Sequence, residues 1–129
     1  MELRSIIKQQ EKRRVDVAKV RRYGGSYILE IGNGYVREYG GQILYQIEGN
    51  RVRRYGGSYL YEIDGNKIRE YGGRYILEVE GDKVKRYGGS YTYQIEGSRI
   101  RAYGGSYLYE IEGFISGTEL KALIALLCS

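Results

Sequence analysis

A stretch of 16 residues, repeated head to tail, constrains this chain more than any other feature. The copy at residues 55–70 reads YGGSYLYEIDGNKIRE, and close copies run over residues 23–113. A fixed period dictates the fold, because each copy must bury its apolar side against its neighbours. The chain holds 16 Tyr and 20 Gly and no Pro. Strand-forming aromatics between glycine turns are typical of an all-β protein.

Each copy contains two turn signals, which divide it into two short strands. One is a Gly-Gly pair, such as Gly56-Gly57, and the other is Asn33-Gly34 or a Gly before a polar residue, such as Gly65-Asn66. Asn-Gly and Gly-Gly predict a type I′ hairpin turn, and Gly before a polar residue predicts type II′. With two residues per turn, about six remain for each strand. The six repeats therefore predict an antiparallel up-and-down meander of about twelve short strands.

Charged residues predict the register of this meander. If Gly65-Asn66 is the turn, Ile63 faces Ile68. In the same register Glu62 faces Arg69, and the other copies likewise oppose acids to bases. Opposite charges that face each other across strands stabilise by about 0.2–1 kcal/mol per pair, whereas like charges destabilise. A register one residue off would place the isoleucines opposite charged groups, so we adopt this one.

The alternation along each strand predicts a sheet with one buried and one charged face. In the central copy the buried face carries Tyr59, Tyr61, Ile63 and Ile68. A wide open sheet would leave that face wet and its edges unpaired. We therefore expect a closed or nearly closed barrel. A two-sheet sandwich, a single-layer sheet that dimerises and a 16-residue solenoid are the alternatives.

Residues 114–129 predict a helix that packs on or in the barrel. Ser116 and Glu119 match a capping box, and the helix that follows, to about Leu127, is apolar over much of its circumference. A twelve-stranded barrel is too wide for its own side chains to fill. We expect this helix to plug the apolar face, as part of the same domain as the repeats at residues 18–113. An interface helix that pairs with another copy is the alternative.

Residues 1–17 form a basic N-terminal arm. Residues 1–22 hold eight Lys or Arg against three Asp or Glu, whereas the rest of the chain holds 13 of each. The apolar residues of the arm predict a short amphipathic helix, which would dock on the sheet as a solvated lead-in. Alternatively, its basic face contacts nucleic acid, a membrane surface or a partner groove. The candidate contact residues are Lys8, Lys12, Arg13 and Arg14.

The composition argues against catalysis. The chain has no His and one Cys, Cys128, so it lacks the usual general base and a metal cluster. Each carboxylate of the repeats has a predicted basic partner across the strand, which favours a structural role. We expect a protein that is not an enzyme and that binds no cofactor or metal. With no disulfide, no signal peptide and no membrane-spanning segment, we expect it in the cytoplasm.

The tyrosine that precedes each Gly-Gly pair is a candidate for a binding surface, together with arginines of the repeats. These residues are Tyr23, Tyr39, Tyr55, Tyr71, Tyr87 and Tyr103, and Arg37, Arg53, Arg69 and Arg101. Exposed rings beside arginines would resemble a platform for single-stranded nucleic acid. The neutral charge of the repeats argues against that reading, because phosphate neutralisation dominates such binding.

Two main hypotheses follow for the function. The first is a non-catalytic scaffold or protein-binding repeat module, whose partner is another protein or a second copy of the chain. The alternative is single-stranded nucleic-acid binding through the basic arm and the Tyr/Arg face. A carbohydrate-binding surface is a third hypothesis, which rests only on exposed tyrosines.

The pattern Tyr-Gly-Gly-Ser-Tyr-x-Tyr-Glu-Ile-x-Gly-x-x-Ile-Arg covers most of the chain. It resembles tandem 16-residue Tyr/Gly β-hairpin repeats in uncharacterised bacterial proteins. The likeness to YD, MORN and choline-binding repeats is smaller, because the chain has no Tyr-Asp pair and no Trp. The resemblance implies a bacterial hairpin-repeat protein and assigns no role to a particular residue.

Overall fold

The structure is a computed structural model that describes residues 17–129. The predictions for the arm, including those for Lys8, Lys12, Arg13 and Arg14, lie outside the described residues.

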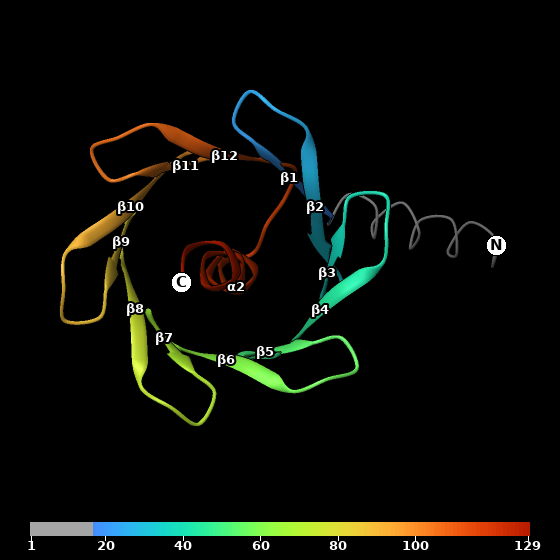
Figure 1. Ribbon diagram of the computed structural model, residues 1–129, viewed down its shortest axis with the longest axis horizontal. Coiled ribbons are helices and arrows are strands. Elements are labelled where there is room, and N and C mark those ends of the chain that lie inside the picture. The colour runs from blue at the N-terminus through green and yellow to red at the C-terminus, as the bar shows by residue number, and fades with distance from the viewer. Residues whose placement is uncertain (1–16) are drawn as a thin grey trace, which may run out of the picture.

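Twelve antiparallel strands form a closed barrel, in which each strand pairs with its neighbours in sequence and β1 pairs with β12. The strands are β1 (Ala18–Arg22), β2 (Tyr27–Gly32), β3 (Tyr35–Glu38), β4 (Ile43–Glu48), β5 (Arg51–Arg54), β6 (Tyr59–Asp64), β7 (Lys67–Glu70), β8 (Tyr75–Glu80), β9 (Lys83–Arg86), β10 (Tyr91–Glu96), β11 (Arg99–Ala102) and β12 (Tyr107–Glu112). Figure 1 shows the hairpins arranged in a ring around helix α2 (Gly117–Cys128), which lies at the centre of the barrel. The predicted barrel is confirmed, and the sandwich, the single layer and the solenoid are excluded.

The register at the Asn-Gly and Gly-polar turns is the predicted one. Ile63 faces Ile68, and Glu62 faces Arg69. Asn33 and Gly34 both have positive φ, 56° and 83°, as a type I′ turn requires. At Gly65-Asn66 only the first residue has positive φ, 63°, which fits type II′. The local turn signals and the charge pairs therefore identified these hairpins correctly.

The prediction of type I′ turns at the Gly-Gly pairs is wrong. Only the first glycine of each pair has positive φ, for example 70° at Gly56. The N–H of Gly57 donates to the carbonyl of Arg54 at 2.9 Å, which closes a turn with Tyr55 and Gly56 at its centre. Positive φ at the third residue of such a turn fits type II. The tyrosine thus belongs to the turn, and the short strands hold four residues, or five in β1.

Each long strand carries a β-bulge on the side of the preceding short strand. Val52 pairs with Tyr61 and Arg53 pairs with Tyr59, so Leu60 is skipped. The carbonyl of Leu60 instead accepts a hydrogen bond from the N–H of Tyr71 at 2.9 Å. A bulge re-aims the side chains beside it, and Tyr59 therefore lies on the outer face rather than on the buried face predicted for it. The skipped residues are Ile28, Leu44, Leu60, Ile76, Thr92 and Leu108.

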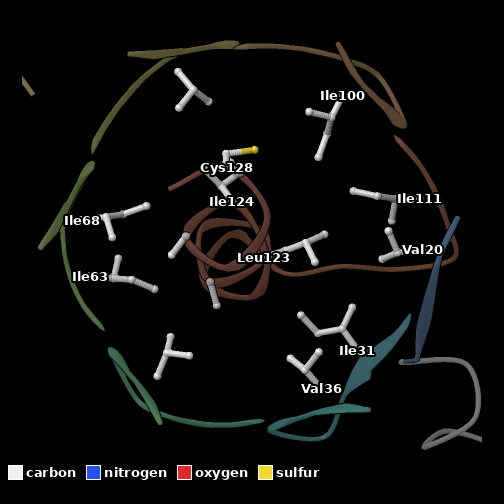
Figure 2. Packing of buried hydrophobic residues seen from close by; sticks show 14 of the residues in the cluster. Val20, Ile31, Val36, Ile63, Ile68, Ile100, Ile111, Leu123, Ile124 and Cys128 are labelled. Carbon is white, nitrogen blue, oxygen red and sulfur yellow. The ribbon is translucent and has the colours of Figure 1, made fainter. Parts of the chain in front are cut away.

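The interior is built from branched side chains of the wall and from helix α2. Ile31, Ile68 and Ile100 are fully buried, as are Leu123 and Ile124 of the helix. Figure 2 shows these isoleucines on the wall around the helix. The hydroxyl of Ser116 accepts from the N–H of Glu119 at 3.2 Å, and the Glu119 carboxylate accepts from the N–H of Ser116 at 3.0 Å. The predicted capping box and the predicted plug are both confirmed.

No helix within residues 17–129 is both long enough and apolar enough to cross a membrane.

The junction of β1 and β12 has no room for a side chain at Gly113. Its φ is 96°, and a Cβ there would lie 2.9 Å from the carbonyl oxygen of Val17. We expect Gly113→Ala to lower the free energy of unfolding by roughly 2 kcal/mol or more, through backbone strain and overpacking. Urea denaturation measures the loss.

Gly97→Ala is the matched control, because Gly97 also has positive φ, 59°, but a Cβ there meets open space. It should cost about 1–2 kcal/mol, from backbone strain alone. An equal cost for the two substitutions would show that the junction accommodates a methyl group.

Candidate binding surface

The six turn tyrosines form a ring around the outside of the barrel, at the end where the Gly-Gly turns lie. We call them the tyrosine belt: Tyr23, Tyr39, Tyr55, Tyr71, Tyr87 and Tyr103. Between 44% and 55% of each residue is exposed. The bulges bring a second tyrosine, the first residue of a long strand, to the same outer face. The belt therefore presents aromatic rings around almost the whole circumference.

Five members of the belt pack against the tyrosine that begins a neighbouring long strand. The ring centroids of Tyr71 and Tyr59 are 4.9 Å apart, at an angle of 30°. The five pairs are Tyr23–Tyr107, Tyr27–Tyr39, Tyr59–Tyr71, Tyr75–Tyr87 and Tyr91–Tyr103, with centroids 4.9–5.3 Å apart. Such offset pairs contribute roughly 0.5–1.5 kcal/mol beyond the area that they bury.

One cation lies over both rings of each pair. The guanidinium of Arg51 is 5.6 Å from the ring centroids of both Tyr59 and Tyr71. The other cations are Lys19, Lys67, Lys83 and Arg99, at 5.2–6.0 Å. These distances are within the range of a cation–π interaction. Sequence reasoning missed these cations, although a Lys or Arg begins β5, β7, β9 and β11 and is the second residue of β1.

In four units of the belt a carboxylate accepts a hydrogen bond from the tyrosine that begins the long strand. The Tyr75 hydroxyl donates to Asp64 at 2.6 Å, and this hydrogen bond raises the pKa of Tyr75 above its ordinary value. The Tyr59 hydroxyl donates to Glu48 at 2.8 Å. Since the hydrogen bond to Asp64 requires the phenolic proton, the Tyr75 hydroxyl remains a neutral donor. The corresponding pairs Tyr91–Glu80 and Tyr107–Glu96 are 3.3 Å long.

The predicted arginines lie beside the belt, and three of them are held by groups of the protein itself. Arg101 forms an ion pair with Glu96 at 2.6 Å and donates to the carbonyl of Gly105, and its hydrogen bond to Glu96 raises its pKa. Arg53 is paired with Glu48 at 3.5 Å. Arg69 lies 4.0 Å from Glu62. For Arg37 no ion pair occurs within residues 17–129.

One unit of the belt, on β2, β3 and β4, differs from the other five. Tyr35 stands where the other units have the cation, and Ile43 stands where they have the stacking tyrosine. Gly32 replaces the carboxylate. Tyr35 instead contacts the belt residue Tyr55 edge-on, with ring centroids 6.0 Å apart. The three changes together leave an uncharged, apolar patch, which we call the gap: Tyr35, Ile43 and Tyr55.

Within residues 17–129 there is no group of three His, Cys, Asp or Glu side chains that could hold a metal ion. Burial raises the pKa of the Cys128 thiol to about 12, so the thiol is protonated at neutral pH.

Comparisons with known proteins add no family. No family model matches the chain, and no curated protein or solved structure is similar enough to count as a match.

Glu110 on β12 links the two strands that close the barrel. Its carboxylate accepts from Arg21 on β1 at 2.6 and 3.0 Å and from Arg99 at 3.4 Å. The hydrogen bond from Arg21 is the main reason why the pKa of Glu110 is lower than its ordinary 4.5. A carboxyl whose pKa is lower in the folded state stabilises the fold above its unfolded pKa and loses that contribution as pH falls.

We therefore expect Glu110 to contribute to the free energy of unfolding in a pH-dependent way. The contribution is complete above pH 4.5 and is lost as pH falls through the pKa of Glu110 in the folded state. The Glu110→Gln variant should be less stable than the wild type at pH 7, and this difference should shrink below pH 4.5. Urea denaturation at a series of pH values measures it. A difference that stays constant with pH would assign the role of Glu110 to packing rather than to charge.

Proposed function

We propose that the chain is a non-catalytic binding module that presents the tyrosine belt to a protein partner. The observation that carries this proposal is the internal pairing of the belt's charges. Arg51 lies over the rings of Tyr59 and Tyr71 and 3.5 Å from Glu62, and Arg53 is paired with Glu48. Such a surface is aromatic and close to neutral. Tyr and Arg are the residue types enriched at protein–protein interfaces.

The gap supplies a place for a partner to anchor. Tyr55 is the most exposed member of the belt, at 55%, and its neighbours in the gap, Tyr35 and Ile43, carry no charge. Binding energy concentrates in a few aromatic or apolar contacts from which water is excluded. Burying this patch breaks no ion pair, since Arg37, which lies opposite Ile43, forms none within residues 17–129. Covering any of the other five units would desolvate both a cation and a carboxylate.

Single-stranded nucleic-acid binding is the second candidate, favoured by the exposure of the belt tyrosines. It is the weaker one, because three of the four arginines beside the belt, Arg53, Arg69 and Arg101, are already paired with carboxylates. A phosphate would have to displace Glu96 from Arg101, where the ion pair is 2.6 Å long. Phosphate contacts dominate the affinity of such proteins.

Two substitutions of equally exposed aromatic residues test the protein-binding proposal. Tyr55→Ser changes the gap, whereas Phe114→Ser removes a ring that is 58% exposed and lies outside the belt. A partner is identified by capture on the immobilised wild type, and its affinity for each variant is then measured by titration. We expect Tyr55→Ser to weaken binding about tenfold or more, and Phe114→Ser to leave it unchanged.

If the partner is a second copy of the chain, sedimentation at a series of concentrations measures the affinity of self-association. We again expect Tyr55→Ser to weaken it and Phe114→Ser to leave it unchanged. Equal effects of Tyr55→Ser and Phe114→Ser, or no effect of Tyr55→Ser on any partner, would contradict the role of the belt.

The nucleic-acid alternative has a separate readout. A labelled oligothymidylate is titrated across a salt series with the wild type, with Arg101→Gln and with a chain that starts at Val17, which keeps β1 whole. If the protein-binding proposal holds, affinity at 150 mM salt is negligible for all three. Tight binding that weakens steeply with salt and is reduced by Arg101→Gln would favour the alternative.

A further inference from the structure

A cavity lies inside the mouth of the barrel, between the C-terminal end of helix α2 and the wall formed by β6 to β10. Its volume is about 960 Å³, within the range of small-molecule sites, roughly 300–1,000 Å³. It opens at the end where the Gly-Gly turns and the tyrosine belt lie, since Tyr87 of the belt borders it. Nothing in the proposed function of the belt requires this cavity.

The cavity exists because one helix does not fill a twelve-stranded barrel. The helix lies toward β6, where the Tyr61 hydroxyl and the Ser129 hydroxyl are 2.9 Å apart. Lys121 of the helix also donates to the carbonyl of Gly65 at 2.8 Å, beyond the end of β6. On β8 a smaller residue, Leu77, stands at the position that Tyr61 and Tyr93 occupy on β6 and β10. The missing ring widens the space beside the helix.

The lining combines an apolar floor with neutral hydroxyl groups. Leu77 is buried, and the thiol of Cys128 stays protonated because burial raises its pKa to about 12. Burial is also the main reason why the pKa of Tyr93 is raised, so its phenol is a neutral donor. Such a lining suits an apolar chain or ring that carries a hydrogen-bond acceptor at one end.

The charge at the mouth follows from a ring of inward-facing residues at the ends of the short strands. Each lies directly opposite a residue of the inner wall, as Arg86 lies opposite Leu77, and directly opposed residues share a face. The ring reads Arg22, Glu38, Arg54, Glu70, Arg86 and Ala102. Basic and acidic residues alternate around it until Ala102, where the next acid is missing.

This break leaves a positive charge at the cavity. Of the two neighbours of Arg86 in the ring, Ala102 is neutral and Glu70 is 3.8 Å from the guanidinium of Arg74. Arg86 itself forms no ion pair within residues 17–129. It borders the cavity together with Tyr93, and the paired Glu70 and Arg74 also line it, so the three charged side chains of the lining sum to +1. A guanidinium beside a phenol hydroxyl is suited to a carboxylate, which accepts hydrogen bonds from both.

We propose that the cavity binds a small monoanionic amphiphile, with its apolar body against Leu77 and Cys128 and its carboxylate at Arg86 and Tyr93. The site is independent of the tyrosine belt as a protein interface, so either proposal stands without the other.

Decanoate and dodecanoate, below their micelle concentrations, are the probes, and decanol is the uncharged counterpart of the first. Isothermal titration to the full chain should show binding of at least one carboxylate and about tenfold or more weaker binding of decanol. Arg86→Gln should reduce carboxylate affinity to the level of decanol.

Arg54→Gln is the matched control, because Arg54 has the equivalent place in the ring and does not line the cavity. It should leave the affinity unchanged. Leu77→Tyr restores the residue present at the same position in four of the six copies, so the variant should fold. It should abolish binding of both the carboxylate and the alcohol by filling the cavity. The far-ultraviolet circular dichroism and thermal unfolding of each variant show that it is folded.

No binding of either carboxylate by the wild type would overturn the proposal. Equal losses in Arg86→Gln and Arg54→Gln would also overturn it, because the attraction would then be to the net charge of the mouth. Binding that survives Leu77→Tyr in a folded protein would place the carboxylate elsewhere and contradict the site.

Discussion

The pairing of the first strand with the last is the interaction on which the rest of the structure depends. Val20 of β1 faces Ile111 of β12, although the whole repeat array lies between them in the sequence. Without this pairing the sheet would have two open edges, each with a row of unpaired backbone groups. The inner wall would also be incomplete around helix α2. Because such a long-range contact closes a long loop, barrel closure is expected to be a late and slow event in folding.

The charged face serves two purposes at once. Pairs such as Glu62 and Arg69 fix the register of the hairpins, and the same side chains then neutralise the arginines next to the belt. Each tyrosine pair lies under the charged group of a cation, as the Tyr59–Tyr71 pair lies under Arg51, so most charges next to the belt are balanced within the protein. The regularity comes from the 16-residue period itself, because five of the six units hold two tyrosines, one cation and one carboxylate at equivalent positions. A binding surface assembled in this way needs no dedicated loop.

Local signals in the sequence predicted much of the fold. The Gly-polar turns, the opposed charges and the capping box of Ser116 and Glu119 each depend on residues a few positions apart. The bulges were missed, because Tyr59 and Tyr61 are the same residue type and simple alternation puts both inside. Their faces differ because Leu60 between them is bulged out of the pairing with β5. Its carbonyl accepts a hydrogen bond from the N–H of Tyr71, a residue eleven positions further along the chain.

The candidate surface was predicted only in part. The turn tyrosines are read directly from the period, and the structure places them on the outer face with their ring partners. The cations over those rings, such as Arg51, were seen only as register pairs, because a cation–π contact requires the bulged tyrosine to face outward. The cavity was not predicted at all. It depends on where helix α2 lies in the barrel and on the difference between Leu77 and Tyr61, neither of which has a local signature.

The gap at Tyr35 and Ile43 gives the ring of six hairpins a single distinguishable position. A perfectly repeated ring would offer a partner six equivalent orientations, with a statistical gain in affinity of RT ln 6, about 1 kcal/mol. A ring with one altered unit gives up this gain and defines one orientation and one stoichiometry instead. A partner that binds at the gap therefore has one defined angular position around the barrel axis.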